Sequence, residues 1–179
     1  MKAKETNLPK FLNAPKQFII PVYQRTYSWK RQQCVKLWDD IVRIGSDDKN
    51  TGHFIGSVVY IEKGIYNVTA VPELLVIDGQ QRLTTITLLV AALAKVIEEQ
   101  DLDIGISSKK LRNYFLFNSD EEGDLRYKLV LTRGDNPTLK KVLKSLVPGE
   151  SPSPRILDNF RLFYNRMASG KYDLRKLSP

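Results

Sequence analysis

The longest apolar stretch of the chain runs from Leu83 to Ile97 and consists almost wholly of Leu, Ile, Val, Ala and Thr. It is too long for a strand and too apolar on all sides for a surface helix, so it predicts a helix buried on most of its faces. A short apolar run, Leu74 to Ile77, precedes it and predicts a buried strand, which the turn-forming pair Asp78-Gly79 ends. The pattern therefore predicts a strand, a tight turn and a buried helix in direct succession.

Patterns along the rest of the chain alternate between the periods of strands and helices. Runs of β-branched and aromatic residues predict strands, and apolar residues at helical spacing predict amphipathic helices. Strands are expected at 17–20, 54–61 and 126–132, and helices at 29–44, 107–117, 138–146 and from residue 154 onward. This order predicts an α/β (α+β) fold with a small sheet flanked by helices and additional helices at the C-terminal end.

Local signals set the expected ends of these elements. Pro21 should end the first strand, because proline cannot donate a hydrogen bond to a β ladder. Ser28 is expected to cap the helix that begins at Trp29. Ser153-Pro154 predicts a helix start, because proline is favoured at the first helical position.

The same pattern divides the chain. Residues 1–147 are expected to form one domain, and residues 148–179 a linker followed by the last helix. The apolar stripe of that helix either folds back onto the domain or docks a domain that this chain lacks. Residues 1–9 have no apolar core, so no signal peptide is expected there, and the run at 83–97 falls short of the roughly 20 residues that span a bilayer.

The composition narrows the class of protein. A length of 179 residues suffices for one large domain, and the net charge of +8 favours an anionic partner such as nucleic acid, although cations spread over a surface give the same total. Cys34 is the only cysteine, which excludes an internal disulfide and a cysteine-based zinc cluster. We expect a cytoplasmic protein in which Cys34 is a small buried residue and not a nucleophile.

Polar residues gather at the turn between the predicted strand and the buried helix. Asp78, Gln80, Gln81 and Arg82 lie where unpaired backbone N–H groups and the positive end of a helix dipole favour an anion. Arg82 offers a fork of donors for phosphate, Asp78 an oxygen ligand for Mg²⁺, and the glutamines groups that orient water or contact a base. The alternative is that Asp78 only caps the helix, Gly79 makes the turn and the other side chains are solvated.

A second polar group follows the first predicted strand. Tyr23, Gln24 and Arg25 supply an aromatic ring, an amide and a guanidinium, which together are able to stack on a base and hold a phosphate. The alternative is that Tyr23 and Tyr27 fill the edges of the core while Arg25 pairs with a carboxylate.

Three segments together resemble one known family. They are Asp78-Gly79-Gln80-Gln81-Arg82, the upstream Ile20-Pro21-Val22-Tyr23-Gln24-Arg25-Thr26-Tyr27-Ser28-Trp29, and between them His53-Phe54-Ile55-Gly56-Ser57. They resemble the signatures of the DUF262 family, the N-terminal domain of GmrSD-type and related modification-dependent restriction proteins. The resemblance implies a ParB/sulfiredoxin-like fold, in which a Gly-x-x-Arg turn, here Gly79 to Arg82, holds nucleotide phosphates.

The resemblance also implies a function and a set of site residues. It implies that the domain binds, and through Mg²⁺ hydrolyses, a nucleoside triphosphate in the restriction of modified DNA, as in phage defence. The implied catalytic residues are Asp78, Gln80, Gln81 and Arg82, with Asp78 as metal ligand; the implied nucleotide-binding residues are Tyr23, Gln24, Arg25, Gly79, Arg82 and Thr84; and Tyr23, Gln24 and Arg25 are the implied DNA-sensing residues. The chain has no Gly-x-x-x-x-Gly-Lys-Ser/Thr segment, which excludes an ordinary P-loop enzyme.

The implied partners are modified DNA and a nuclease domain of the His-Asn-His type, with no membrane partner. A chain with one histidine cannot contain that nuclease, so we expect a truncated protein, a fragment or a standalone homologue. Two rival functions stay open at this point: a DNA- or nucleotide-binding module without turnover, and a structural domain that positions a nuclease. The sequence leaves the nucleotide base, the DNA modification and the oligomeric state undetermined.

Overall fold

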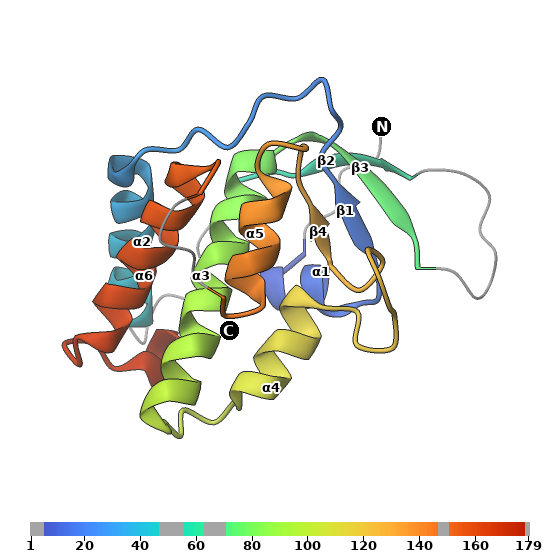
Figure 1. The fold of residues 1–179 in the computed structure, drawn as a ribbon. Coiled ribbons are helices and arrows are strands. Elements are labelled where there is room, and N and C mark those ends of the chain that lie inside the picture. The colour runs from blue at the N-terminus through green and yellow to red at the C-terminus, as the bar shows by residue number, and fades with distance from the viewer. Residues whose placement is uncertain (1–5, 47–55, 63–70, 147–150, 178–179) are drawn as a thin grey trace.

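The computed structural model describes residues 6–46, 56–62, 71–146 and 151–177, which include a four-stranded sheet in the order β2-β3-β1-β4 (Figure 1). The strands are β1 (Gln17–Ile19), β2 (Val59–Glu62), β3 (Glu73–Asp78) and β4 (Leu129–Val130). β1 pairs in parallel with both β3 and β4, whereas β2 pairs with β3 in the antiparallel direction. The carboxyl ends of β1, β3 and β4 therefore meet at one edge of the sheet, called the carboxyl edge below.

Helix α3 (Gln80–Gln100) follows β3 directly and is the central helix of the molecule. It is buried on most sides, as the apolar run predicted, and begins three residues earlier than expected. Its buried threonines are satisfied within the helix: the hydroxyl groups of Thr84, Thr85 and Thr87 each donate to the carbonyl four residues before, at 2.8 to 2.9 Å. This local bonding allows polar side chains in a helix that water does not reach.

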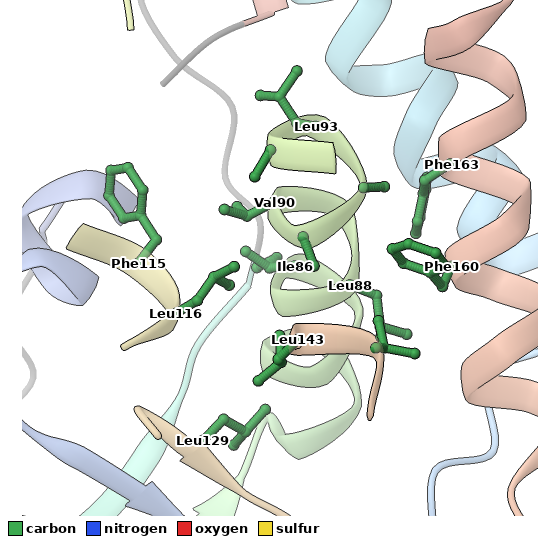
Figure 2. Close-up of a cluster of buried hydrophobic side chains, with 14 of the residues drawn as sticks. Ile86, Leu88, Val90, Leu93, Phe115, Leu116, Leu129, Leu143, Phe160 and Phe163 are labelled. Atoms are coloured by element: carbon green, nitrogen blue, oxygen red, sulfur yellow. The ribbon is translucent and has the colours of Figure 1, made fainter. Parts of the chain in front are cut away.

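The other helices surround α3. They are α1 (Leu8–Asn13), α2 (Arg31–Gly45), α4 (Ser108–Leu111) with a π-helical turn at Arg112–Leu116, α5 (Asn136–Leu143), α6 (Pro154–Ala168) and a 3-10 turn at Leu174–Leu177. Figure 2 shows α3 between Phe115 and Leu116 on one side and Phe160 and Phe163 of α6 on the other. The last helix thus folds back onto the domain and shares its core. The predicted docking of a nuclease domain stays a prediction.

The predicted mixed α/β class, with a small sheet flanked by helices, is confirmed, whereas several element ends differ from expectation. The residue that caps α2 is Lys30 and not Ser28, because Gln81 binds the backbone of Ser28 and holds it outside the helix. The strand expected at 126–132 shortens to β4, and Tyr127 forms an isolated bridge with Phe117. The helix expected at 107–117 divides into α4 and the π-helical turn.

β2 starts later than expected, whereas α6 starts at Pro154 as expected. The strand expected at 54–61 is observed from Val59, and residues 53–55 lie outside the described residues. Ser153 does precede α6, but its hydroxyl donates to Asp135 Oδ1 at 2.6 Å instead of capping the helix. Within the described ranges, the structure contains no helix with the length and apolar character that crossing a membrane requires.

Candidate functional site

The site is built around the turn at Gly79, which joins β3 to α3. Gly79 has φ of +89° and is the N-cap residue of the helix. A Cβ atom at this position would lie 2.7 Å from the carbonyl oxygen of Ser57, so a larger residue would be both strained and obstructed. Glycine therefore lets the residues before β2 pack against the start of α3.

Arg82 strengthens the same contact. Its Nη1 donates to the carbonyl of Ser57 at 3.1 Å, and a Cβ atom at Gly56 would lie 2.6 Å from its Nε. Gly56 and Ser57 thus pack against the Arg82 guanidinium and fix its position. No carboxylate among the described residues pairs with Arg82, and a guanidinium has five donors, so donors are left to bind an anion at the start of α3.

Asp78 is exposed at the carboxyl end of β3. The alternative that it only caps α3 is wrong, because Gly79 occupies the cap position and α3 has no side-chain cap. Within the described ranges, no hydrogen bond or ion pair involves the Asp78 carboxylate. The first N–H groups of α3, the Arg82 guanidinium and an unpaired carboxylate consequently lie within one short segment.

The two glutamines of this segment differ sharply in their contacts. Gln81 Oε1 accepts from the backbone N–H groups of Ser28 at 2.7 Å and Trp29 at 3.3 Å, and Gln81 Nε2 donates to the Thr26 carbonyl at 3.2 Å. Gln80 is similarly buried, with 8 % of its surface exposed, but no other described residue bonds its amide. Gln81 holds the 26–29 segment in place, whereas the amide of Gln80 has no hydrogen-bond partner among the described residues.

The predicted base-binding residues lie beside Asp78. Pro21 to Gln24 form a turn in which the Gln24 N–H donates to the Pro21 carbonyl at 3.0 Å. Gln24 Nε2 also donates to the carbonyl of Ile77 at 2.9 Å, which fixes the turn against the end of β3. Tyr23 at its tip is 72 % exposed, so the alternative that Tyr23 fills the edge of the core is wrong.

The same alternative is right for Tyr27 and wrong for Arg25. Tyr27 does fill the core, with 5 % of its surface exposed, and its hydroxyl lies 2.8 Å from Thr85 Oγ1 and accepts from Asn159 Nδ2 at 3.0 Å. Arg25 is exposed and no described carboxylate pairs with it. Burial raises the pKa of Tyr27 well above its usual range, so this hydroxyl stays neutral and acts as an anchor.

Cys34 lies against the same anchor. Its Sγ is 3.6 Å from the Tyr27 hydroxyl, and burial raises the pKa of the thiol. A buried, protonated thiol is a poor nucleophile, which agrees with the predicted packing role.

Sequence analysis missed residues from distant parts of the chain that hold this loop. Asp135 accepts from the backbone N–H of Tyr27 through Oδ2, and Asn159 Nδ2 also donates to the Trp29 carbonyl at 2.9 Å. Arg155 Nη1 donates to the Ser28 carbonyl at 3.2 Å. Asp135 precedes the helix expected at 138–146, and a sequence does not show which distant loop such a residue will reach.

Thr84 and Asp78 are the remaining predicted ligand contacts, one to nucleotide and one to Mg²⁺. Thr84 is buried and its hydroxyl bonds within α3, so as placed it lies beneath the surface of the site. No cluster of three or more metal-ligating side chains occurs in the described ranges. Asp78 nevertheless suits Mg²⁺, because this ion is commonly held by one or two carboxylates together with water and the phosphates of a substrate.

A search among curated proteins gave no match. The family model described as GmrSD restriction endonuclease, N-terminal domain, matches residues 8–176, which include all three segments of the site. The chain therefore belongs to the family of GmrSD restriction endonuclease N-terminal domains and is a restriction-system protein.

Proposed function

We propose that the site at the carboxyl edge binds a nucleoside triphosphate with Mg²⁺ and hydrolyses it in the service of DNA restriction. One observation carries the proposal. Three segments far apart in the sequence, at 21–29, 56–57 and 78–82, converge there, and some of their side chains hold the site together while others have no partner. The side chains of Gln24 and Gln81 bond to the frame of the site, whereas the side chains of Asp78 and Gln80 have no hydrogen-bond partner among the described residues. Structural residues alone would not require these unpartnered groups side by side.

Each residue has a role that follows from its chemistry. Arg82 and the N–H groups at the start of α3 hold phosphate, and Gly79 keeps that surface open to it. Asp78 supplies the carboxylate that would hold Mg²⁺ or orient the attacking water, and Gln80 a neutral group that positions it. Mg²⁺, when bound, neutralises charge that develops on the phosphates.

The turn at the end of β1 supplies the base and DNA contacts. Tyr23, exposed beside Asp78, offers a ring on which a base stacks, and Gln24 and Arg25 flank it. The exposure of Tyr23 favours a role in sensing modified DNA. We propose that this sensing controls a nuclease domain of the His-Asn-His type, and that the protein acts in the cytoplasm. The rival function is a module that binds nucleotide or DNA without turnover.

Asp78→Asn separates these functions. The variant removes the charge while keeping the shape, so it should fold as the parent does and bind nucleotide without metal. Its Mg²⁺-dependent phosphate release should fall at least ~100-fold, because the carboxylate acts in the reaction. Phosphate release with each of the four ribonucleoside triphosphates, with and without DNA, measures the effect.

Asp120→Asn is the matched control, since Asp120 is an exposed aspartate in a turn outside the three converging segments. It should hydrolyse nucleotide at the parent rate. If Asp78→Asn also does so, or if the parent releases no phosphate from any nucleotide with DNA present, the domain is a binding module.

A further inference from the structure

Five exposed cations lie on the loop between β1 and α2, at the start of α2, and in the parts of the chain that contact this loop. They are Arg25, Lys30, Arg31, Arg133 and Arg155. No carboxylate among the described residues forms an ion pair with any of them. The ion pairs found among the described residues lie elsewhere: within α2, between α2 and α6, at the end of α3 and on α5. Positive charge at this end of the molecule is thus left for a partner outside the chain.

Contacts between distant segments bring the five cations to the same end of the molecule. Arg155 reaches the Ser28 carbonyl, two residues from Lys30, at 3.2 Å. A Cβ atom at Gly134 would lie 3.8 Å from Thr26 Cγ2, and Tyr27 bonds Asp135, so the backbone that carries Arg133 runs beside the backbone that carries Arg25. Figure 1 shows the segment between β1 and α2 crossing the end of the molecule, above the starts of the helices.

The helices add to this potential. α2, α3, α5 and α6 all begin at this end, since the loop at 26–29 bonds to Gln81 near the start of α3, to Asp135 at the cap of α5 and to Asn159 in the first half of α6. None of the four has an acidic residue in its first turn. The positive ends of the dipoles therefore coincide with the cations, and the arrangement is unfavourable for the isolated chain.

The carboxylates of this region do not cancel the charge. Asp135 is buried and accepts from Tyr27 and Ser153. Asp78 belongs to the candidate site, and Asp158 lies one turn further into α6 than Arg155. On the far side of Arg31, a hollow of about 260 Å³ between α2 and α6 adds Lys171, whereas Arg166 of the same hollow pairs with Asp39 at 3.1 Å.

We propose that these five cations form a basic track that binds the phosphate backbone of duplex DNA and delivers it to the candidate site. The inference rests on the proposed function, because membership in a restriction system supplies the reason to choose DNA among polyanions. It adds a surface, distinct from the nucleotide contacts, with Arg25 at the junction between the two. DNA lying on the track would pass beside Tyr23.

The size of the track fits a duplex. α2, α6 and α5 lie side by side, and packed helices are roughly 8 to 10 Å apart, so the track extends on the order of 20 Å. At 3.4 Å per base pair, this length corresponds to about six base pairs. Each cation that neutralises a phosphate releases condensed counterions, so the track should be visible in the salt dependence of DNA binding.

The test uses the full chain with three track residues changed, Lys30→Gln, Arg31→Gln and Arg133→Gln, which leaves Arg25 and Arg155 and their neighbours intact. The matched control is Lys109→Gln, Lys141→Gln and Lys144→Gln, three exposed lysines of α4, the end of α5 and the residue after it, at the opposite end. Affinity for a 20-base-pair duplex is measured at several salt concentrations, together with nucleotide binding by thermal shift.

The track variant should lower the slope of log affinity against log salt by about 2 to 3, since each lost phosphate contact contributes roughly 0.9. The control variant should change it by less than about 0.5, and nucleotide binding should be unchanged in both. The proposal would be overturned if the track variant kept the slope of the parent, or if the parent bound no duplex. Binding to phosphatidylserine vesicles is measured in parallel, and a track variant that lost only vesicle binding would also overturn the proposal. If the slope falls as expected while the parent releases no phosphate, the track stands and the proposed hydrolysis is wrong.

Discussion

At the scale of residues, the neighbouring glutamines 80 and 81 show how position decides the role of a side chain. Both are more than nine-tenths buried at the start of α3, and both look alike in the sequence. Gln81 uses both ends of its amide on the backbone of the 26–29 segment, and the side-chain amide of Gln80 bonds no described residue. We therefore expect Gln81 to maintain the frame and Gln80 to contact the ligand.

Gln81→Ala should lower the free energy of unfolding by about 1 to 3 kcal/mol, because it leaves the N–H groups of Ser28 and Trp29 without an acceptor. Gln80→Ala, the matched control at a site of equal burial, should cost markedly less stability and instead weaken nucleotide binding. Urea unfolding of the two variants measures the difference. Equal losses of stability would show that Gln81 does not hold the loop.

The sequence predicted which residues gather at the turn after β3, but it did not predict which residues they contact. The turn at Gly79 and the end of β3 beside Asp78 follow from local signals, namely an apolar run and a turn pair. The partner of Gln81 lies 53 residues away, and that of Asp135 lies 108 residues away. Local periodicity carries no information on such contacts, because packing of the whole domain decides them.

At the scale of elements, the end of α1 shows how a short helix is stabilised. Six residues are too few for a stable helix in water, so α1 depends on tertiary contacts. The Nζ of Lys128, next to β4, donates to the carbonyls of Ala14 at 2.8 Å and Asn13 at 3.4 Å. Lys128 thereby satisfies carbonyls that the helix end leaves open.

This lysine makes the stability depend on pH. Burial, with Lys16 nearby, lowers the pKa of Lys128 to about 8, against about 10.4 in an unfolded chain. Between these values the unfolded chain binds more protons, so the free energy of unfolding should rise as the pH increases from 8 to 10. Urea unfolding of the parent and Lys128→Met over this range should show the parent gaining stability relative to the variant.

Lys109→Met changes an exposed lysine and should give a difference from the parent that stays flat across the same pH range. If the unfolding free energy of the parent minus that of Lys128→Met stayed constant or fell between pH 8 and 10, the lowered pKa of Lys128 would be contradicted.

The element ends that sequence analysis misplaced are likewise set by contacts between distant residues. The start of α2 is set by Gln81 and not by the capping preference of Ser28.

At the scale of the whole molecule, α6 belongs to the core although the sequence separates it by a linker. Ile156 and Phe163 are fully buried, and Phe160 packs in the same cluster as α3 (Figure 2). Asn159 of this helix also anchors Tyr27 under the site. The domain of residues 1–147 expected from the sequence would lack both contributions.

A chain that ends at residue 147 should therefore show no cooperative unfolding. In the full chain, Phe160→Ala should cost about 3 to 5 kcal/mol, because it leaves a cavity in the core. Asn165→Ala, an exposed position on the same helix, should stay within about 0.5 kcal/mol of the parent. A cooperative transition near the parent midpoint for the shortened chain would show that residues 148–179 are a separate unit.

The pairing of β1 with β4 also has a consequence for synthesis on the ribosome. Phe18 aligns with Leu129, and Tyr27 meets Asn159, 132 residues later. At about 5 to 20 residues per second, roughly 7 to 26 s separate the translation of the two halves of that contact. The loop that carries Tyr23 thus emerges long before its anchors, and a nascent chain acquires a competent site only after its last helix has left the exit tunnel.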